Sequence, residues 1–194
     1  KEVAKKMNIW LVSREYAGIA EAGGVKNVAT SLCESLARLG HSMTLFIPFY
    51  GCTDLSHVEN CDSNSEDKVA EIKVDEHFEK LVYFSGRMNG VNIVFVKHPF
   101  FTEKRAVYTY THQDELEDPE HKQGQGHFDV NFLNTVFQKA VIRYGEIFCK
   151  ENIPDGTVLV AEEQTGGKGR LQRSFFSPPD KGIWFSVVLR PDFL

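Results

Sequence analysis

Residues 13–27 read SREYAGIAEAGGVKN, and this stretch decides the fold that we expect for the chain. The continuous apolar run Ile9–Val12 leads into it, which is typical of a strand buried on both faces of a parallel sheet. A periodic apolar pattern begins at Val25, so the order is strand, glycine-bearing loop and helix. Because glycine has no Cβ, Gly23 and Gly24 let the backbone pass close to a ligand, and the following helix N-terminus suits a phosphate. The stretch predicts the opening unit of a nucleotide-binding α/β domain or, alternatively, a tight turn without a ligand.

The segments after this loop continue the alternation of helix and strand. The helix that begins near Val25 is expected to end at Gly40, and 43–47 reads as a second buried strand that ends at Pro48. The short return between them predicts a right-handed crossover and parallel strands. The expected apolar stripe of the helix comprises Val25, Val28, Ala29, Leu32, Leu36 and Leu39.

A hairpin is expected in the middle of the chain. Two apolar runs, 80–85 and 91–96, flank a segment that ends in Asn89-Gly90, a pair typical of tight hairpin turns. The polar segment 54–68 and the acidic segment 114–120 are predicted to be surface loops.

The last third of the chain begins with the cleanest helical pattern, over 132–144. Asp129 or Asn131 is a candidate cap for this helix. Buried strands are expected at 157–161 and 183–189. Together these elements predict an α/β fold, a Rossmann-like parallel sheet in three layers, with a β-rich C-terminal segment.

Composition narrows the function classes. The chain has 194 residues, of which 42% are hydrophobic, and a net charge of -5, so we expect no nucleic-acid partner. Its apolar runs are shorter than the roughly 20 residues of a membrane span, so no membrane partner is expected. The polar residues 1–6 are expected to be a leftover or frayed end, because no apolar region of a signal peptide follows them. Cysteines that lie far apart in the sequence favour a reducing cytoplasm. The four cysteines form no CxxC pair, so no metal site is predicted. Two of them are expected in the core (Cys33 and Cys149) and two in loops (Cys52 and Cys61).

A series of short motifs gives the first half of the chain a resemblance to a known family. Roughly residues 7–154 resemble the N-terminal domain of the bacterial glycogen/starch synthase family. The matching pieces follow one another in the family's order: Trp10–Glu15, Ala22–Val25, Ala37–His41, Phe46–Tyr50, Ile93–Phe101, Phe132–Tyr144 and Ile153–Asp155.

The resemblance implies a retaining glucosyltransferase of two Rossmann-like domains, which transfers glucose from ADP-glucose to an α-1,4-glucan without a cofactor. The implied donor-binding residues are Gly23, Gly24 and Asn27, and the implied cleft-lining residues are Glu21, His98 and Phe101. Glu21 stands where the family pattern has a lysine. The second domain, with the catalytic residues, has no counterpart in this sequence, so no catalytic residue is assigned and the chain by itself is expected to be inactive.

Two of the implied cleft residues have a second interpretation. His98 either lines the cleft or is a loop histidine buried against Pro99. Phe100 and Phe101 either belong to the core or form a platform for a sugar ring.

The last part of the chain resembles a different family. Roughly residues 155–194 look like the part of biotin–protein ligases that closes over biotinyl-5′-adenylate, through the motifs EQTGGKGR (163–170) and FFSPP (175–179). The implied contacts, with biotin and ATP as substrates, are Gln164, Lys168, Gly169, Arg170 and Arg173. The alternative is a solvated cationic loop. The chain therefore divides into a tail (1–6), a synthase-like domain (7–154) and a ligase-like fragment (155–194), and a fusion without catalytic activity is the third hypothesis.

Overall fold

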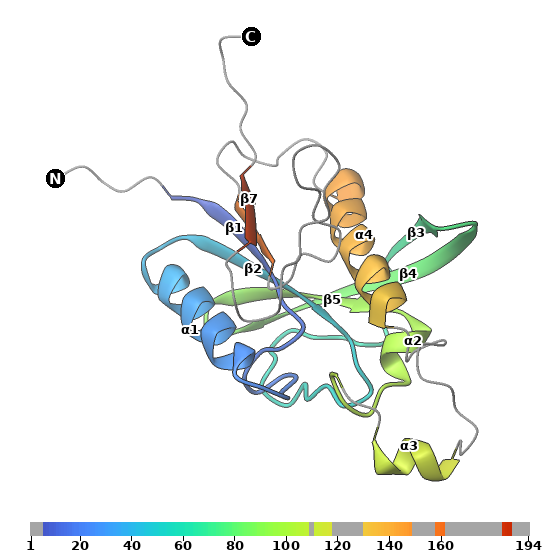
Figure 1. Ribbon diagram of the computed structural model, residues 1–194. Coiled ribbons are helices and arrows are strands. Elements are labelled where there is room, and N and C mark those ends of the chain that lie inside the picture. Colours follow the sequence, from blue (N-terminus) through green and yellow to red (C-terminus); the bar gives the residue numbers. More distant parts are fainter. Residues whose placement is uncertain (1–5, 109–110, 118–129, 149–157, 162–183, 188–194) are drawn as a thin grey trace, which may run out of the picture.

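The computed structural model describes residues 6–108, 111–117, 130–148, 158–161 and 184–187. These residues form a seven-stranded sheet in the order β3-β4-β5-β2-β1-β6-β7, with α1 and α4 on opposite sides of it (Figure 1). The strands are β1 (Asn8–Val12), β2 (Ser42–Pro48), β3 (Lys68–Val74), β4 (His77–Met88), β5 (Val91–Lys97), β6 (Val158–Ala161) and β7 (Trp184–Val187). The helices are α1 (Val25–Arg38), α2 (Pro99–Thr102), α3 (His112–Glu117) and α4 (Val130–Phe148).

The sheet is mixed. Strands β6, β1, β2 and β5 are parallel to one another, as the β-α-β pattern predicted, whereas β3, β4 and β7 run antiparallel to their neighbours. The α/β prediction is confirmed, and the expectation of a parallel sheet holds for its centre. The antiparallel strands come from hairpins, which need only a short turn and no crossover helix.

Strand β6 comes from the ligase-like segment and lies inside the sheet of the synthase-like segment. It pairs with β1 from Ile9 opposite Val158 to Val12 opposite Ala161, and β7 pairs with its other edge. The strand expected at 157–161 is confirmed in this position. The two segments therefore share one sheet.

Helix α4 packs on the sheet through aromatic side chains. Tyr144 meets Trp10 of β1, Phe46 of β2 and Tyr83 of β4 edge-on, with ring centroids 6.2, 5.2 and 5.2 Å away. The Tyr83 hydroxyl donates a hydrogen bond of 2.8 Å to the Ala140 carbonyl oxygen. These contacts fix the position of α4 over the strands and thus the position of its first turns at the sheet's edge.

The buried face of α1 differs from the predicted stripe. The fully buried residues are Ala29 and Cys33, while Val28 and Leu39 are 68% and 73% exposed. Small side chains let α1 lie close to β2 and β5, so the larger apolar residues beside them stay outside. The helix was therefore predicted correctly, but its buried face is rotated by about one residue from the predicted apolar stripe.

Turns and loops follow the prediction only in part. Asn89 and Gly90 both have positive φ (49° and 82°), as a tight hairpin turn requires, and β4 and β5 are longer than expected. Segment 54–68 is a loop as predicted, up to its last residue. Lys68 begins strand β3, and the sequence pattern did not predict this strand.

One local prediction in the second half of the chain was wrong in its described part: residues 114–117 lie in α3 and not in a loop. Asn131 lies within α4, which leaves Asp129 as the cap candidate. Residues 118–120, Asp129 and Cys149 are outside the described part. Within that part no helix is long and apolar enough to cross a bilayer.

Candidate functional site

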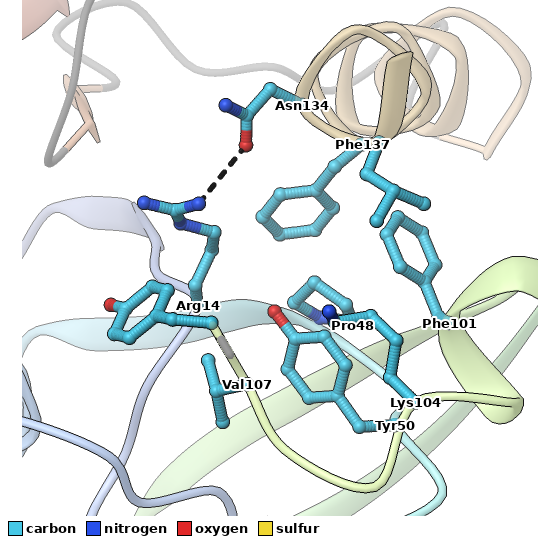
Figure 2. Close-up of a pocket in the computed structure, with 10 residues that line it drawn as sticks. Arg14, Pro48, Tyr50, Phe101, Lys104, Val107, Asn134 and Phe137 are labelled. Atoms are coloured by element: carbon cyan, nitrogen blue, oxygen red, sulfur yellow. Dashed lines mark hydrogen bonds between the residues drawn. The ribbon is translucent and has the colours of Figure 1, made fainter. Parts of the chain in front are cut away.

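A cavity of about 240 Å³ opens where three parallel strands end. Arg14 follows β1, Pro48 ends β2, and Phe101 lies just after β5. Helix α4 covers the opposite wall, and the Phe101 and Phe137 rings face the interior (Figure 2). The other lining residues are Tyr50, Lys104, Val107, Tyr108, Leu133 and Asn134. Ligands of open α/β sheets bind at this carboxyl edge, which makes the cavity the candidate site.

The wall after β5 is shaped by His98 and by Gly51. His98 is 3% exposed; its Nδ1 accepts the Phe100 N–H at 3.2 Å, which caps α2, and its Nε2 lies 3.0 Å from Glu79 Oε2. A Cβ on Gly51 would lie 2.5 Å from the Thr102 carbonyl oxygen, so glycine lets the two loops touch. These contacts position Phe101 and the Lys104 loop against the cavity.

The polar lining is rich in donors. The Arg14 guanidinium donates a hydrogen bond to Asn134 Oδ1 at 3.3 Å and lies 4.6 Å from the centre of the Tyr108 ring (Figure 2). Lys104 is 5% exposed and Tyr50 meets the Phe101 ring edge-on. A guanidinium, an ammonium and the Tyr50 phenol beside aromatic faces fit a ligand that carries hydroxyl or anionic oxygens on a ring.

The glycine loop lies next to this cavity and already binds an anion from its own chain. Glu15 is fully buried, and its Oε2 accepts the N–H groups of Ala22 at 3.0 Å and Gly23 at 2.6 Å. Burial by itself raises the pKa of Glu15, but the Tyr108 hydroxyl, the two loop amides and Lys26 together lower it below the usual value. The carboxylate therefore holds the loop in place at the start of α1.

A second carboxylate closes the outer side of the loop. Glu21 accepts the Gly18 N–H at 2.7 Å and pairs with Lys26 at 2.5 Å. Because Lys26 is on the first turn of α1, this ion pair ties the loop to the helix.

The predicted site residues fall in three groups. Phe101 lines the cavity, whereas His98 and Glu21 are not among the lining residues. Gly23, Gly24 and Asn27 are exposed at the start of α1; the Gly23 N–H is used by Glu15, and nothing lies within 4 Å of a Cβ built on Gly24. Gln164, Lys168, Gly169, Arg170 and Arg173 lie outside the described residues.

Five polar lining residues were not predicted: Arg14, Tyr50, Lys104, Tyr108 and Asn134. A signal was available for Arg14 and Tyr50, which each come two residues after a buried parallel strand and hence at the carboxyl edge. The other three follow from the loop after β5 and from the position of α4, which are tertiary features. Among the described residues, no group of histidine, cysteine, aspartate and glutamate side chains could hold a metal ion.

The models of two protein families match the chain. The model of the starch synthase catalytic domain matches residues 8–155. The chain belongs to the starch synthase catalytic domain family. Granule-bound starch synthase 2 of Pisum sativum is 37% identical over 95 residues, which are 49% of this chain and 12% of that protein. The catalytic domain of starch synthase IV from Arabidopsis thaliana is 21% identical with a TM-score of 0.58; the match covers 79% of this chain and 27% of that one, and it shows a common fold.

The second family matches the end of the chain. The model of the biotin/lipoate A/B protein ligase family covers residues 137–193. The bifunctional ligase/repressor BirA of Bacillus spizizenii is 51% identical over 44 residues, 23% of this chain and 14% of that protein. Matches to both families support a fusion of two partial domains. The chain spans between 12% and 14% of the length of these two relatives.

The two family models overlap over residues 137–155, which include most of α4. Strand β6 follows this overlap and lies within the match to the ligase family alone.

Because the pKa of Glu15 is lowered in the folded state, we expect the stability of the protein to decrease at acidic pH. A carboxyl group whose pKa is lower in the folded than in the unfolded state contributes stability above its unfolded pKa, near 4.5, and this contribution disappears as the pH falls through the folded value. We expect the urea midpoint of the wild-type protein to decrease below about pH 4.5 more steeply than that of Glu15→Gln. Parallel pH profiles of the two proteins would contradict this assignment.

Proposed function

We propose that this chain supplies the N-terminal half of a starch-synthase-type glucosyltransferase, the half that holds a sugar ligand at the carboxyl edge of the sheet. In this proposal, glucose passes from ADP-glucose to the non-reducing end of an α-1,4-glucan, and no cofactor takes part. The observation that carries it is the cavity of about 240 Å³ in which Arg14, Lys104, Tyr50, Tyr108 and Asn134 meet at the ends of β1, β2 and β5.

The chemistry of the lining supports a sugar or a sugar nucleotide. Aromatic rings such as Phe101 and Phe137 offer faces and edges to the apolar side of a pyranose ring, and the guanidinium of Arg14 offers donors to hydroxyl or phosphate oxygens. The starch synthase IV domain of similar fold was solved with ADP and acarbose bound, which adds support for ligands of this class.

Binding and transfer are separate parts of the proposal. The family resemblance places the catalytic residues in a second Rossmann-like domain, and this chain covers 27% of the starch synthase IV domain. We therefore expect the chain by itself to bind ligand weakly and to release no ADP from ADP-glucose. The exposed N-terminus of α1, with Gly24 and Asn27, remains the proposed side for the donor diphosphate.

Titration calorimetry of the full chain with ADP-glucose, ADP and maltotetraose tests this proposal. We expect dissociation constants in the millimolar range for at least one of the sugar ligands, and an increase of about tenfold for Arg14→Met, which removes charge-assisted hydrogen bonds but keeps an apolar side chain. Arg87→Met is the matched control, since Arg87 is exposed on β4 and does not line the cavity.

The calorimetry has two outcomes that would contradict the proposal. One is the absence of heat with all three ligands at millimolar concentration. The other is equal affinity of the wild-type protein and Arg14→Met, which would place any binding outside the cavity.

The match to residues 137–193 favours a second candidate function, the binding of biotin and ATP by the ligase-like segment. A shift of the melting temperature with biotin plus ATP, and streptavidin-detected self-biotinylation, would support it. An unchanged melting temperature with both substrates would contradict this candidate function. The segment would then contribute only the strands β6 and β7 to the sheet.

A further inference from the structure

Strand β3 lies at the edge of the sheet, and no other strand among the described residues pairs with its outer side. It comes first in the strand order and pairs on its inner side with β4, through a two-residue turn between Val74 and His77 (Figure 1). In such a hairpin the residues that flank the turn bond to each other, so residues 70, 72 and 74 bond inward and 69, 71 and 73 point their N–H and C=O groups outward. The Lys73 carbonyl oxygen accepts a hydrogen bond from Lys139 Nζ of α4, which agrees with this assignment.

Two of the three outward residues, Glu71 and Lys73, carry opposite charges on an exposed face. Glu71 and Lys73 are exposed, whereas Ala70, Ile72 and Val74 are buried beneath α4. The partner of Lys73 within the chain is Glu76, at 3.5 Å and itself 90% exposed, which is a weak surface pair. The order glutamate, isoleucine, lysine is therefore available to another strand.

This order is complementary to itself. If a second β3 lies antiparallel with Ile72 opposite Ile72, Glu71 of each copy faces Lys73 of the other, and both symmetric pairs are outward-pointing residues that exchange backbone hydrogen bonds. If the twofold axis moves from Ile72 to a neighbouring residue, Glu71 no longer lies opposite Lys73. An axis at Glu71 places two glutamates opposite each other, and an axis at Lys73 places two lysines opposite each other. Charge complementarity thus selects one partner, a second copy, and one register.

The surface beside the edge has room for such a strand. A groove of about 260 Å³ runs between β3 and α4, and Ile142 on its α4 side is 61% exposed. A strand seated on β3 would cover this side chain and would replace Lys139 at the Lys73 carbonyl oxygen.

We propose that two copies of this chain associate through their β3 edges, with Glu71 of each copy opposite Lys73 of the other. The two sheets then continue as one across a twofold axis at Ile72. This association is independent of the sugar-binding function proposed above.

Sedimentation equilibrium of the full chain from micromolar to millimolar concentration tests the inference. We expect a monomer–dimer equilibrium for the wild-type protein and an association constant about tenfold lower for Glu71→Lys or Lys73→Glu, because each change turns both symmetric pairs from attractive to repulsive. The double variant E71K/K73E restores the wild-type constant, and an equimolar mixture of the two single variants forms a heterodimer. Arg87→Glu carries the same charge change as Lys73→Glu away from the edge and leaves the constant unchanged.

Thermal unfolding of each variant shows that the fold is intact, since both side chains are exposed. A wild-type protein that stays monomeric throughout would overturn the inference, and so would a dimer that is insensitive to the single reversals. Failure of the double variant to restore association, with a normal thermal unfolding curve, would overturn the pairing of Glu71 with Lys73.

Discussion

Replacing Leu159 with proline is expected to destabilise the whole sheet strongly. Residue 159 lies on β6, between β1 and β7, so every backbone N–H of this strand faces a paired neighbour. A proline there removes a ladder hydrogen bond and distorts the strand, at a cost of about 3 kcal/mol or more. This cost is a large share of the roughly 5–15 kcal/mol that stabilises a domain.

Urea denaturation followed by far-ultraviolet circular dichroism measures this effect. Glu66→Pro is the control, because Glu66 is exposed in the loop before β3 and outside every ladder, and we expect its midpoint to stay close to that of the wild-type protein. An unchanged midpoint for Leu159→Pro would mean that the ligase-like segment does not contribute to the synthase-like fold.

Replacing Glu15 with alanine is expected to destabilise the chain by about 3 kcal/mol. The carboxylate is fully buried and accepts the Ala22 and Gly23 N–H groups, which lose their partner in the variant. The start of α1 then has neither a side-chain cap nor the internal anion, since Gly24 at the cap position supplies none.

Glu21→Ala is the matched control, because it removes a carboxylate from the same loop at an exposed position. We expect a small change in the urea midpoint for this variant, as for other surface ion pairs. Equal losses for Glu15→Ala and Glu21→Ala would show that burial of Glu15 does not decide its contribution.

Glu15 also explains what the glycine loop does in this chain. A pair of glycines before a helix predicts a phosphate site or a tight turn, and sequence spacing does not distinguish the two. The structure puts the Glu15 carboxylate, from the loop after β1, on the Gly23 N–H and leaves Gly24 exposed. An acidic residue eight positions upstream was visible in the sequence, but its contact with the loop depends on the turn between them.

The strands and helices with strong periodicity were predictable from the sequence. Local patterns with a single physical interpretation predicted most of the regular elements. These elements are β1, β2, β5, α1, α4 and the turn at Asn89-Gly90. Strand β3 was missed because its alternating charged and apolar residues follow directly on a polar loop without a clear boundary.

The cavity was much less predictable. Its position followed from the rule that ligands bind at the carboxyl edge, but Lys104 and Tyr108 come from an irregular loop and Asn134 comes from a helix whose rotation is set by Tyr144 and Tyr83. Such placements depend on packing between segments far apart in the sequence. The resemblance to starch synthases identified the family, and the three-dimensional arrangement identified the side chains.

Hydrogen–deuterium exchange of the full chain, with and without saturating maltotetraose or ADP-glucose, tests the central claim most directly. The claim is that ligand enters the cavity lined by Arg14, Lys104 and Asn134. It predicts slower exchange with ligand in residues 101–108 and in the first half of α4, and this protection should be lost in Arg14→Met. Unchanged exchange in both segments at ligand saturation, or protection confined to residues outside the cavity, would contradict it.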